Sequence, residues 1–181
     1  MNGRTLVVLA HPDLENSRIT AALAAVANRA PGVEVRDLSA LYPDRVIDVA
    51  AEQAALAHVD EVVLQYPTYW YSMPGLLKQW LDDVLVRGWA YGTGRPGALR
   101  GVGLRVVTST GGVEEEYATG GFHGWPYRDI LVPLEATARR LGMLWREPVV
   151  VHGAREVSEA DLAAVGARYC ALLGHAMTVA A

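Results

Sequence analysis

Short apolar runs alternate along the chain with longer stretches in which apolar residues recur every three or four positions. Four of the runs are rich in Val and Leu, and a fifth alternates apolar with charged residues. A continuous apolar run predicts a strand buried on both faces, and the alternating run predicts a more exposed strand. The predicted strands cover 4–10, 33–38 (the alternating one), 60–66, 103–109 and 149–152.

Each predicted strand is followed by a stretch with helical spacing. These helices are predicted over 17–29, 48–58, 74–86, 126–141 and 158–177. Five strands that alternate with five helices predict an α/β fold, a doubly wound five-stranded parallel sheet with helices on both faces. The length fits a single domain over residues 1–181. Two strand orders compete, the flavodoxin-like order 2-1-3-4-5 and the dinucleotide-binding order.

The loop after the third predicted strand, Tyr66 to Gly75, is unusually aromatic. It reads Tyr-Pro-Thr-Tyr-Trp-Tyr-Ser-Met-Pro-Gly. Open α/β sheets bind ligands at the carboxyl ends of their strands, where this loop would lie. Its aromatic rings are expected to pack against a flat surface. The alternatives for that surface are a flavin ring, a protein partner and the core beneath the loop.

The loop after the first predicted strand is polar and contains no glycine triplet. The dinucleotide fingerprint needs such glycines, so that strand order loses support. Ser17 stands at the start of the first helix, where free N–H groups favour an anion, and His11 offers an imidazole N–H. In the alternative interpretation, Ser17 only caps the helix and His11 only closes a strand.

The loop after the fourth predicted strand contains Thr110, Gly111, Gly112 and, further on, His123 between glycines. Paired glycines allow close backbone approach to a ligand, or simply make a turn. His123 is a candidate proton donor, with a plain surface residue as the alternative. In the order 2-1-3-4-5 the first, third and fourth strands are neighbours, so the three loops would meet at one edge.

Composition narrows the class of protein. The chain is 51% hydrophobic and 20% charged, with a formal charge of −4 and no basic stripe, which argues against nucleic-acid binding. No signal peptide and no run of about 20 apolar residues is present, so we expect a cytoplasmic protein. We expect no metal site. The single cysteine, Cys170, is predicted to be a small core residue.

Several motifs in order resemble the flavodoxin-like NAD(P)H:quinone oxidoreductases. They are His11-Pro12…Ser17, Tyr66-Pro67-Thr68-Tyr69-Trp70-Tyr71-Ser72-Met73-Pro74, Thr110-Gly111-Gly112…Tyr117 and Val151-His152-Gly153-Ala154. The chain is most similar to the short bacterial branch, with general stress protein 14 and the potassium-efflux ancillary flavoprotein. The resemblance implies a bound flavin, NAD(P)H as co-substrate, two-electron ping-pong hydride transfer to a quinone or similar planar acceptor, and a homodimer with sites at the interface.

The resemblance also assigns roles to residues. His11, Ser17 and the neighbouring Arg18 and Ile19 would hold the flavin phosphate. The isoalloxazine ring would pack against the aromatic loop, through Pro67, Thr68, Tyr69, Trp70 and Tyr71. Its pyrimidine end would meet Thr110, Gly111 and Gly112, and the catalytic pair would be Tyr117 and His123.

Some choices stay open at this point. The chain lacks the C-terminal extension of the FAD-binding relatives, which favours FMN, with FAD as the alternative. The acidic run Glu114-Glu115-Glu116 leaves the preference between NADH and NADPH open. Azo or nitro reduction would use the same site. An alternative hypothesis for the function is that the protein is a redox-responsive regulatory subunit of a membrane potassium efflux transporter. A hydrolase is disfavoured, because no Gly-x-Ser-x-Gly motif is present.

Overall fold

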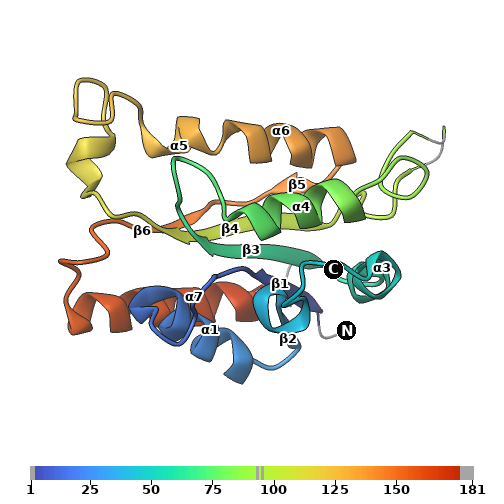
Figure 1. The fold of residues 1–181 in the computed structure, drawn as a ribbon, viewed down its shortest axis with the longest axis horizontal. Coiled ribbons are helices and arrows are strands. Elements are labelled where there is room, and N and C mark those ends of the chain that lie inside the picture. The colour runs from blue at the N-terminus through green and yellow to red at the C-terminus, as the bar shows by residue number, and fades with distance from the viewer. Residues whose placement is uncertain (1–2, 93, 95, 176–181) are drawn as a thin grey trace.

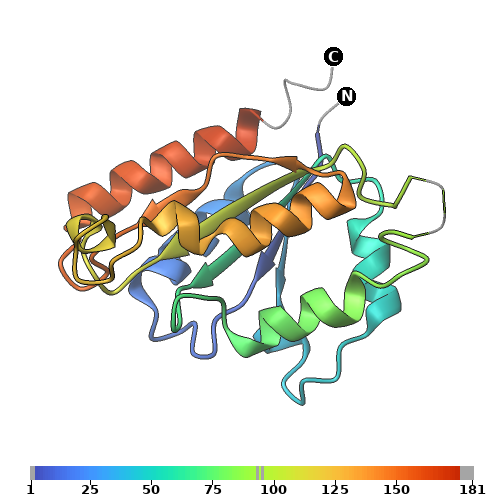
Figure 2. The same ribbon diagram turned by 90° about the horizontal axis from the view of Figure 1, so that it is seen from above.

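A parallel β-sheet with helices on both faces forms the framework of the protein (Figures 1 and 2). The structure, a computed structural model, describes residues 3–92, 94 and 96–175. Within them the sheet has the order β2-β1-β3-β4-β5, with β6 also paired to β4, which confirms the flavodoxin-like order. The strands are β1 Thr5–Leu9, β2 Val33–Asp37, β3 Glu61–Pro67, β4 Gly103–Ser109, β5 Leu144–Trp145 and β6 Val149–Val151.

The sheet has one strand more than the sequence predicts. β5 pairs with the start of β4 and β6 pairs with its end, so the two short strands lie one after the other along the same neighbour. Pro148 separates them. Proline has no N–H to donate to a ladder, so the pairing is interrupted there.

The helices divide between the two faces. α1 and α7 cover one face, while α4 and α6 cover the other (Figure 1). α3 packs against α4 and contributes Leu56 to the same cluster. The helices are α1 Arg18–Arg29, α2 Leu38–Leu41, α3 Val49–Leu56, α4 Gly75–Val84, α5 Tyr127–Ile130, α6 Val132–Leu141 and α7 Glu159–His175, and a 3₁₀ turn η1 spans Glu114–Tyr117.

The core lies on both sides of the central strands. Val63 in β3 is fully buried in the cluster beneath α1 and α7, and the next residue, Leu64, is buried in the cluster beneath α4 and α6. Successive side chains of a strand point to opposite faces, so a continuous apolar run fills both clusters. The central strands are rigid supports for the loops at their carboxyl ends.

Two details of the predicted helices are wrong or incomplete. The helix predicted over 126–141 is two helices, because Pro133 lacks the N–H that a continuous helix would need and its ring would clash one turn back. α2 was not predicted; the Asp37 side chain caps it by accepting from Ser39 N–H at 3.0 Å. Residues 176 and 177 of the last predicted helix lie outside the described residues.

Cys170 is exposed, so its prediction as a core residue is wrong. Tyr169 and Leu173 face the core from α7. Cys170 follows Tyr169 by one residue, which is about 100° of helical rotation, and therefore points outward. Among the described helices, none has the length and apolar character that a membrane crossing requires.

Candidate functional site

The loops after β1, β3 and β4 meet at the carboxyl edge of the sheet, toward the left of Figure 1. Main-chain hydrogen bonds join neighbouring strand ends: Ala10 N–H donates to Gln65 O at 3.0 Å, and Thr68 N–H donates to Ser109 O at 2.9 Å. Side chains continue the contact, because the Tyr71 hydroxyl lies 3.3 Å from His123 Nδ1. Segments predicted to converge from three separate loops are therefore neighbours.

The first turn of α1 offers backbone groups and few free side chains. Ser17 caps the helix by accepting from Thr20 N–H at 3.2 Å. The Arg18 guanidinium is turned toward α7, where it donates to Glu159 at 2.6 Å. Ile19 is buried in the core. Arg18 and Ile19 could therefore serve an anion only through their N–H groups, which helix geometry leaves without intrahelical acceptors.

His11 is held as a neutral imidazole beside a cavity. Asp13 N–H donates to its Nδ1 at 3.0 Å, which places the proton on Nε2. Burial lowers the pKa of His11, so the neutral form persists at neutral pH. His11 and Tyr69 line a 440 Å³ cavity between the loop after β1, α2 and the start of α4.

The aromatic loop is a strained tight turn. Tyr69 and Ser72 exchange two main-chain hydrogen bonds of 2.9 and 3.0 Å. Trp70 and Tyr71 between them have φ values of 49° and 61°. Asn-Gly normally occupies such turns, and left-handed backbone costs about 1–3 kcal/mol for each bulky residue. Trp70 is nonetheless 92% exposed, so packing in this chain does not explain the strain.

The two residues before this turn are held inside the fold. Pro67 is buried at the end of β3. The Thr68 hydroxyl lies 3.0 Å from the Thr108 hydroxyl and also bonds the Tyr127 hydroxyl. These contacts direct the side chain of Thr68 into the fold. A ligand at the carboxyl edge of the sheet would therefore contact the rings of the aromatic turn and not the Thr68 hydroxyl.

The glycine loop is anchored on one side and open on the other. Thr110 Oγ1 donates to Gly112 O at 2.8 Å, and Gly153 N–H donates to the same oxygen at 2.8 Å. A Cβ added to Gly111 would meet no atom within 4 Å, whereas one added to Gly112 would lie 2.8 Å from His123 Nε2 and would clash with Glu116. Gly112 is therefore packed against the predicted catalytic pair, and Gly111 faces open space.

Tyr117 and His123 form a stacked pair. Their ring centroids are 4.1 Å apart and the ring planes are inclined by 20°. Burial, and then the nearby Tyr127 and Tyr71, raise the pKa of Tyr117, so its phenol stays protonated at neutral pH. His123 Nε2 is buried and makes no hydrogen bond within the described residues; the Glu116 carboxylate lies 3.8 Å away. A buried polar atom without a partner is rare and indicates a missing ligand or water.

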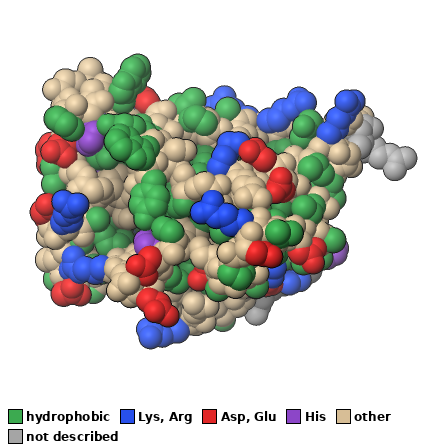
Figure 3. All heavy atoms as spheres, viewed as in Figure 1, with side chains coloured by type: hydrophobic (Ala, Val, Ile, Leu, Met, Phe, Trp, Pro, Cys, Tyr) green, Lys and Arg blue, Asp and Glu red, His purple; other side chains and the backbone are tan. Residues whose placement is uncertain are grey.

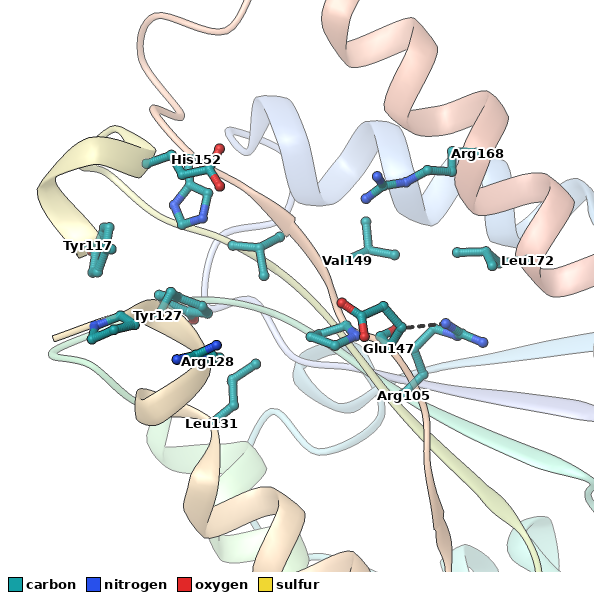
Figure 4. Close-up of a pocket in the computed structure, with 14 residues that line it drawn as sticks. Arg105, Tyr117, Tyr127, Arg128, Leu131, Glu147, Val149, His152, Arg168 and Leu172 are labelled. Atoms are coloured by element: carbon teal, nitrogen blue, oxygen red, sulfur yellow. Dashed lines mark hydrogen bonds between the residues drawn. The ribbon is translucent and has the colours of Figure 1, made fainter. Parts of the chain in front are cut away.

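His152, which the sequence-based assignment of roles passed over, also lies in this cluster. Its Nδ1 is 2.9 Å from Thr110 Oγ1, and burial lowers its pKa. Figure 4 shows it beside Tyr117 and Tyr127, at one end of a 610 Å³ cavity that extends toward Arg168 of α7. The available sequence signal was its position as the last residue of the final predicted strand, which places it at the same edge of the sheet as the other loops.

The site therefore combines three features: helix N–H groups, exposed aromatic rings, and a proton-donating phenol stacked on a histidine. Together they suit a flat ligand with an anionic tail. Among the described residues, no group of three or more His, Cys, Asp or Glu side chains could hold a metal ion. The assignment of individual residues to a ligand stays a prediction.

Comparisons with known proteins agree on the fold. The family described as "flavodoxin-like fold" matches residues 3–173. The glutathione-regulated potassium-efflux system ancillary protein KefF of Klebsiella aerogenes is 44% identical over 164 residues, which are 91% of each chain.

Two solved structures are similar over nearly the whole chain. General stress protein 14 of Treponema denticola in complex with FMN is 36% identical, has a TM-score of 0.87, and is matched over 96% of this chain and 99% of its own. A protein from P. pentosaceus described as an NADPH-quinone reductase is 27% identical, with a TM-score of 0.85 and coverage of 98% and 99%.

Proposed function

This chain belongs to the flavodoxin-like family, and from that premise we propose that it is an FMN-dependent NAD(P)H:quinone oxidoreductase. The observation that carries the proposal is the contact between two loops of the sheet edge. The hydroxyl of Tyr71, in the aromatic turn, lies 3.3 Å from Nδ1 of His123, in the loop after β4. Rings that could flank a planar cofactor thus adjoin groups that could move a proton.

The residues present fit a flavin mononucleotide. The first turn of α1 would hold the phosphate through backbone N–H groups, with the Nε2–H of neutral His11 nearby. The aromatic turn would pack against the ring system. The His123 Nε2 atom marks a polar position at this edge where the described residues supply no hydrogen-bond partner. The FMN bound by general stress protein 14, 36% identical to this chain, supports FMN over FAD.

When bound, the flavin would accept a hydride from the nicotinamide and pass it to the acceptor. The protein would supply position, electrostatics and exclusion of water. Because one planar site serves both substrates in turn, we expect ping-pong kinetics. The exposed rings of the aromatic turn would orient whichever flat molecule is bound.

Tyr117 and His123 would supply the proton for the acceptor oxygen. The raised pKa of Tyr117 keeps its phenol a donor at neutral pH. Stacking at 4.1 Å fixes the two rings relative to each other. A quinone oxygen that gains electrons would therefore meet a hydrogen-bond donor already in place, the arrangement that general acid catalysis requires.

A homodimer is part of the proposal. Trp70, Phe122 and Trp125 are 92%, 84% and 66% exposed, all on loops at the candidate site. Figure 3 shows hydrophobic side chains gathered over this end of the molecule. Exposed aromatics of this kind suit a protein interface, and a partner copy there would close the site from water.

The decisive experiment is a visible spectrum of the purified protein. We expect flavin absorption bands that NAD(P)H bleaches without oxygen and that a quinone then restores. Heat release followed by mass measurement would separate FMN from FAD. A folded, colourless protein that takes up neither flavin in excess would contradict the proposal, and bleaching without reoxidation by any quinone would contradict the choice of acceptor.

A second candidate is a regulatory role beside a potassium efflux transporter. The 44% identity to KefF, an ancillary protein of such a system, favours it. Oxidoreductase activity is compatible with this role, and both fit a cytoplasmic location. Co-purification of the protein with the transporter would test this regulatory role. The Trp70→Asn variant would test whether the exposed turn takes part in the contact. Loss of flavin activity alone would not count as evidence for the regulatory role.

A further inference from the structure

We propose that His152 is a positioning residue: through the hydroxyl of Thr110 it holds residues 110–113 so that the N–H groups of Gly111 and Val113 point at the polar edge of the flavin ring. This inference rests on the proposed function and deepens it. It assigns the ring edge to specific donors and explains what keeps them in place.

The direction of the hydrogen bonds follows from counting protons. Thr110 Oγ1 donates its only proton to Gly112 O at 2.8 Å. The 2.9 Å contact between Thr110 Oγ1 and His152 Nδ1 must then run the other way, with an N–H on Nδ1 donating to the hydroxyl oxygen. His152 therefore fixes the rotation of the hydroxyl, and the hydroxyl in turn fixes the carbonyl of Gly112.

Two carbonyls of the glycine loop are anchored toward the segment after β6. Gly153 N–H donates to Gly112 O and Ala154 N–H donates to Thr110 O, both at 2.8 Å. In a planar trans peptide the N–H points opposite to the C=O. The N–H of Gly111 follows the Thr110 carbonyl and the N–H of Val113 follows the Gly112 carbonyl, so both point away from the anchoring segment.

These two N–H groups are available to a ligand. Neither donates a hydrogen bond to any acceptor in the described part of the chain. Space is also present, because a Cβ on Gly111 would meet nothing within 4 Å. Preorganised N–H groups of this kind stabilise negative charge that develops on a bound group. The donors would accordingly be Gly111 and Val113. The N–H of Gly112 follows the carbonyl of Gly111, which accepts no backbone hydrogen bond from the described residues.

His152 also supports the ring of Tyr117. Its centroid lies 5.4 Å from that of Tyr117 and 5.5 Å from that of Tyr127, at interplanar angles of 40° and 87°. The ring of Tyr117 is therefore in contact with the rings of both His123 and His152. Figure 4 shows Tyr117 beside His152. A test has to separate this packing role from the hydrogen bond.

Two substitutions separate the roles. His152→Phe keeps a ring against Tyr117 and Tyr127 but removes the donor. His152→Asn removes the ring but places an amide N–H where Nδ1 stands, so it can still donate to Thr110. If the hydrogen bond positions the loop, the Asn variant retains the native behaviour and the Phe variant loses it.

The first measurement uses flavin-free protein and needs no activity. Hydrogen exchange of the Gly153 and Ala154 amides, resolved by NMR, reports the bonds to Gly112 O and Thr110 O. One hydrogen bond of ordinary net strength corresponds to a change of about three- to tenfold. We expect exchange faster by about that factor in His152→Phe and close to native in His152→Asn.

The second measurement is the dissociation constant of FMN, from quenching of flavin fluorescence. We expect it to rise by about three- to tenfold in His152→Phe and to stay near native in His152→Asn. The midpoint potential of the bound flavin should fall in the Phe variant only, because misdirected N–H groups stabilise the more negative reduced ring less well.

Native exchange and native affinity in His152→Phe would overturn the proposal. Equal losses in both variants would also overturn it, because they would assign the effect to the ring. If the Phe variant does not fold, Thr110→Val and Thr110→Ser make the same comparison at the hydroxyl. Failure of the native protein to bind any flavin would contradict the proposed function, whereas the amide exchange rates would still decide the role of His152.

Discussion

Two polar clusters in this protein are built in opposite ways. The first, the Glu52 network, comprises Glu52, Arg36, Tyr42 and Trp80. Glu52 is fully buried, yet its carboxylate accepts from Arg36 at 2.5 Å, from the Tyr42 hydroxyl at 2.5 Å and from Trp80 Nε1 at 2.8 Å. The hydrogen bonds that Arg36 donates to this carboxylate raise the pKa of Arg36, so its guanidinium stays charged.

The second, the rim cluster, comprises Trp70, Tyr71, Gly112, Tyr117 and His123. Here a buried nitrogen has no hydrogen-bond partner within the described residues, and a tryptophan that is 92% exposed is held in left-handed backbone. Within the described residues, neither the unpartnered nitrogen nor the left-handed backbone at Trp70 adds an interaction that stabilises the fold. The contrast teaches that satisfied buried groups hold the elements together, while unsatisfied and strained ones mark where a ligand is expected.

Breaking the Glu52 network should have the largest effect. Glu52→Ala leaves the Arg36 charge without its buried counter-ion and also leaves Trp80 Nε1 without an acceptor. We expect a loss of about 3–5 kcal/mol in the free energy of unfolding, measured by urea denaturation. Glu52→Gln, which retains an acceptor oxygen, should lose less. A change within experimental error for Glu52→Ala would remove the network from the forces that hold α3.

At the rim, His123→Ala should affect turnover and leave the fold intact. If His123 helps to protonate the acceptor, quinone turnover should fall by about 10²-fold or more with flavin still bound. Steady-state rates, together with the flavin content of the same sample, test this. Unchanged turnover would exclude His123 from proton transfer, and loss of flavin would reassign it to binding.

Gly112 of the rim cluster and its neighbour Gly111 provide a matched pair. In Gly112→Ala the new methyl group would lie 2.8 Å from His123 Nε2 and would displace Glu116. Overpacking of this kind should weaken FMN binding by about tenfold. Gly111→Ala, whose methyl group enters the open space assigned above to the flavin edge, should weaken binding without displacing His123 or Glu116. Native FMN dissociation constants for both variants would argue against a ligand packed on this loop.

The smallest predicted effect concerns strain. Trp70→Asn replaces a bulky residue by one that tolerates left-handed backbone, so flavin-free protein should gain about 1 kcal/mol of stability. The same change should lower affinity for planar acceptors, seen as a higher KM. A stability decrease would show that the exposed tryptophan supports the fold, and the contrast between the two clusters would lose one of its grounds.

The sequence by itself determined the central strands, the main helices and their succession along the chain. Continuous apolar runs predicted the central strands because burial on both faces favours apolar side chains at successive positions, and the range 103–109 agrees with β4 as observed. The placement of three unusual loops after the first, third and fourth strands favoured the observed strand order. Loop composition singled out His123, the family resemblance added Tyr117, and the structure stacks the two rings together.

The tertiary structure decided what depends on contacts between distant residues. Nothing local in the sequence reveals that Glu52 meets Trp80, 28 residues away, or that Thr110 meets His152, 42 residues away. The left-handed turn at Trp70 and Tyr71 also had no signal, because sequence patterns predict glycine or asparagine there. Periodicity records which face of an element is apolar, whereas a hydrogen bond across the fold depends on how those elements are finally packed.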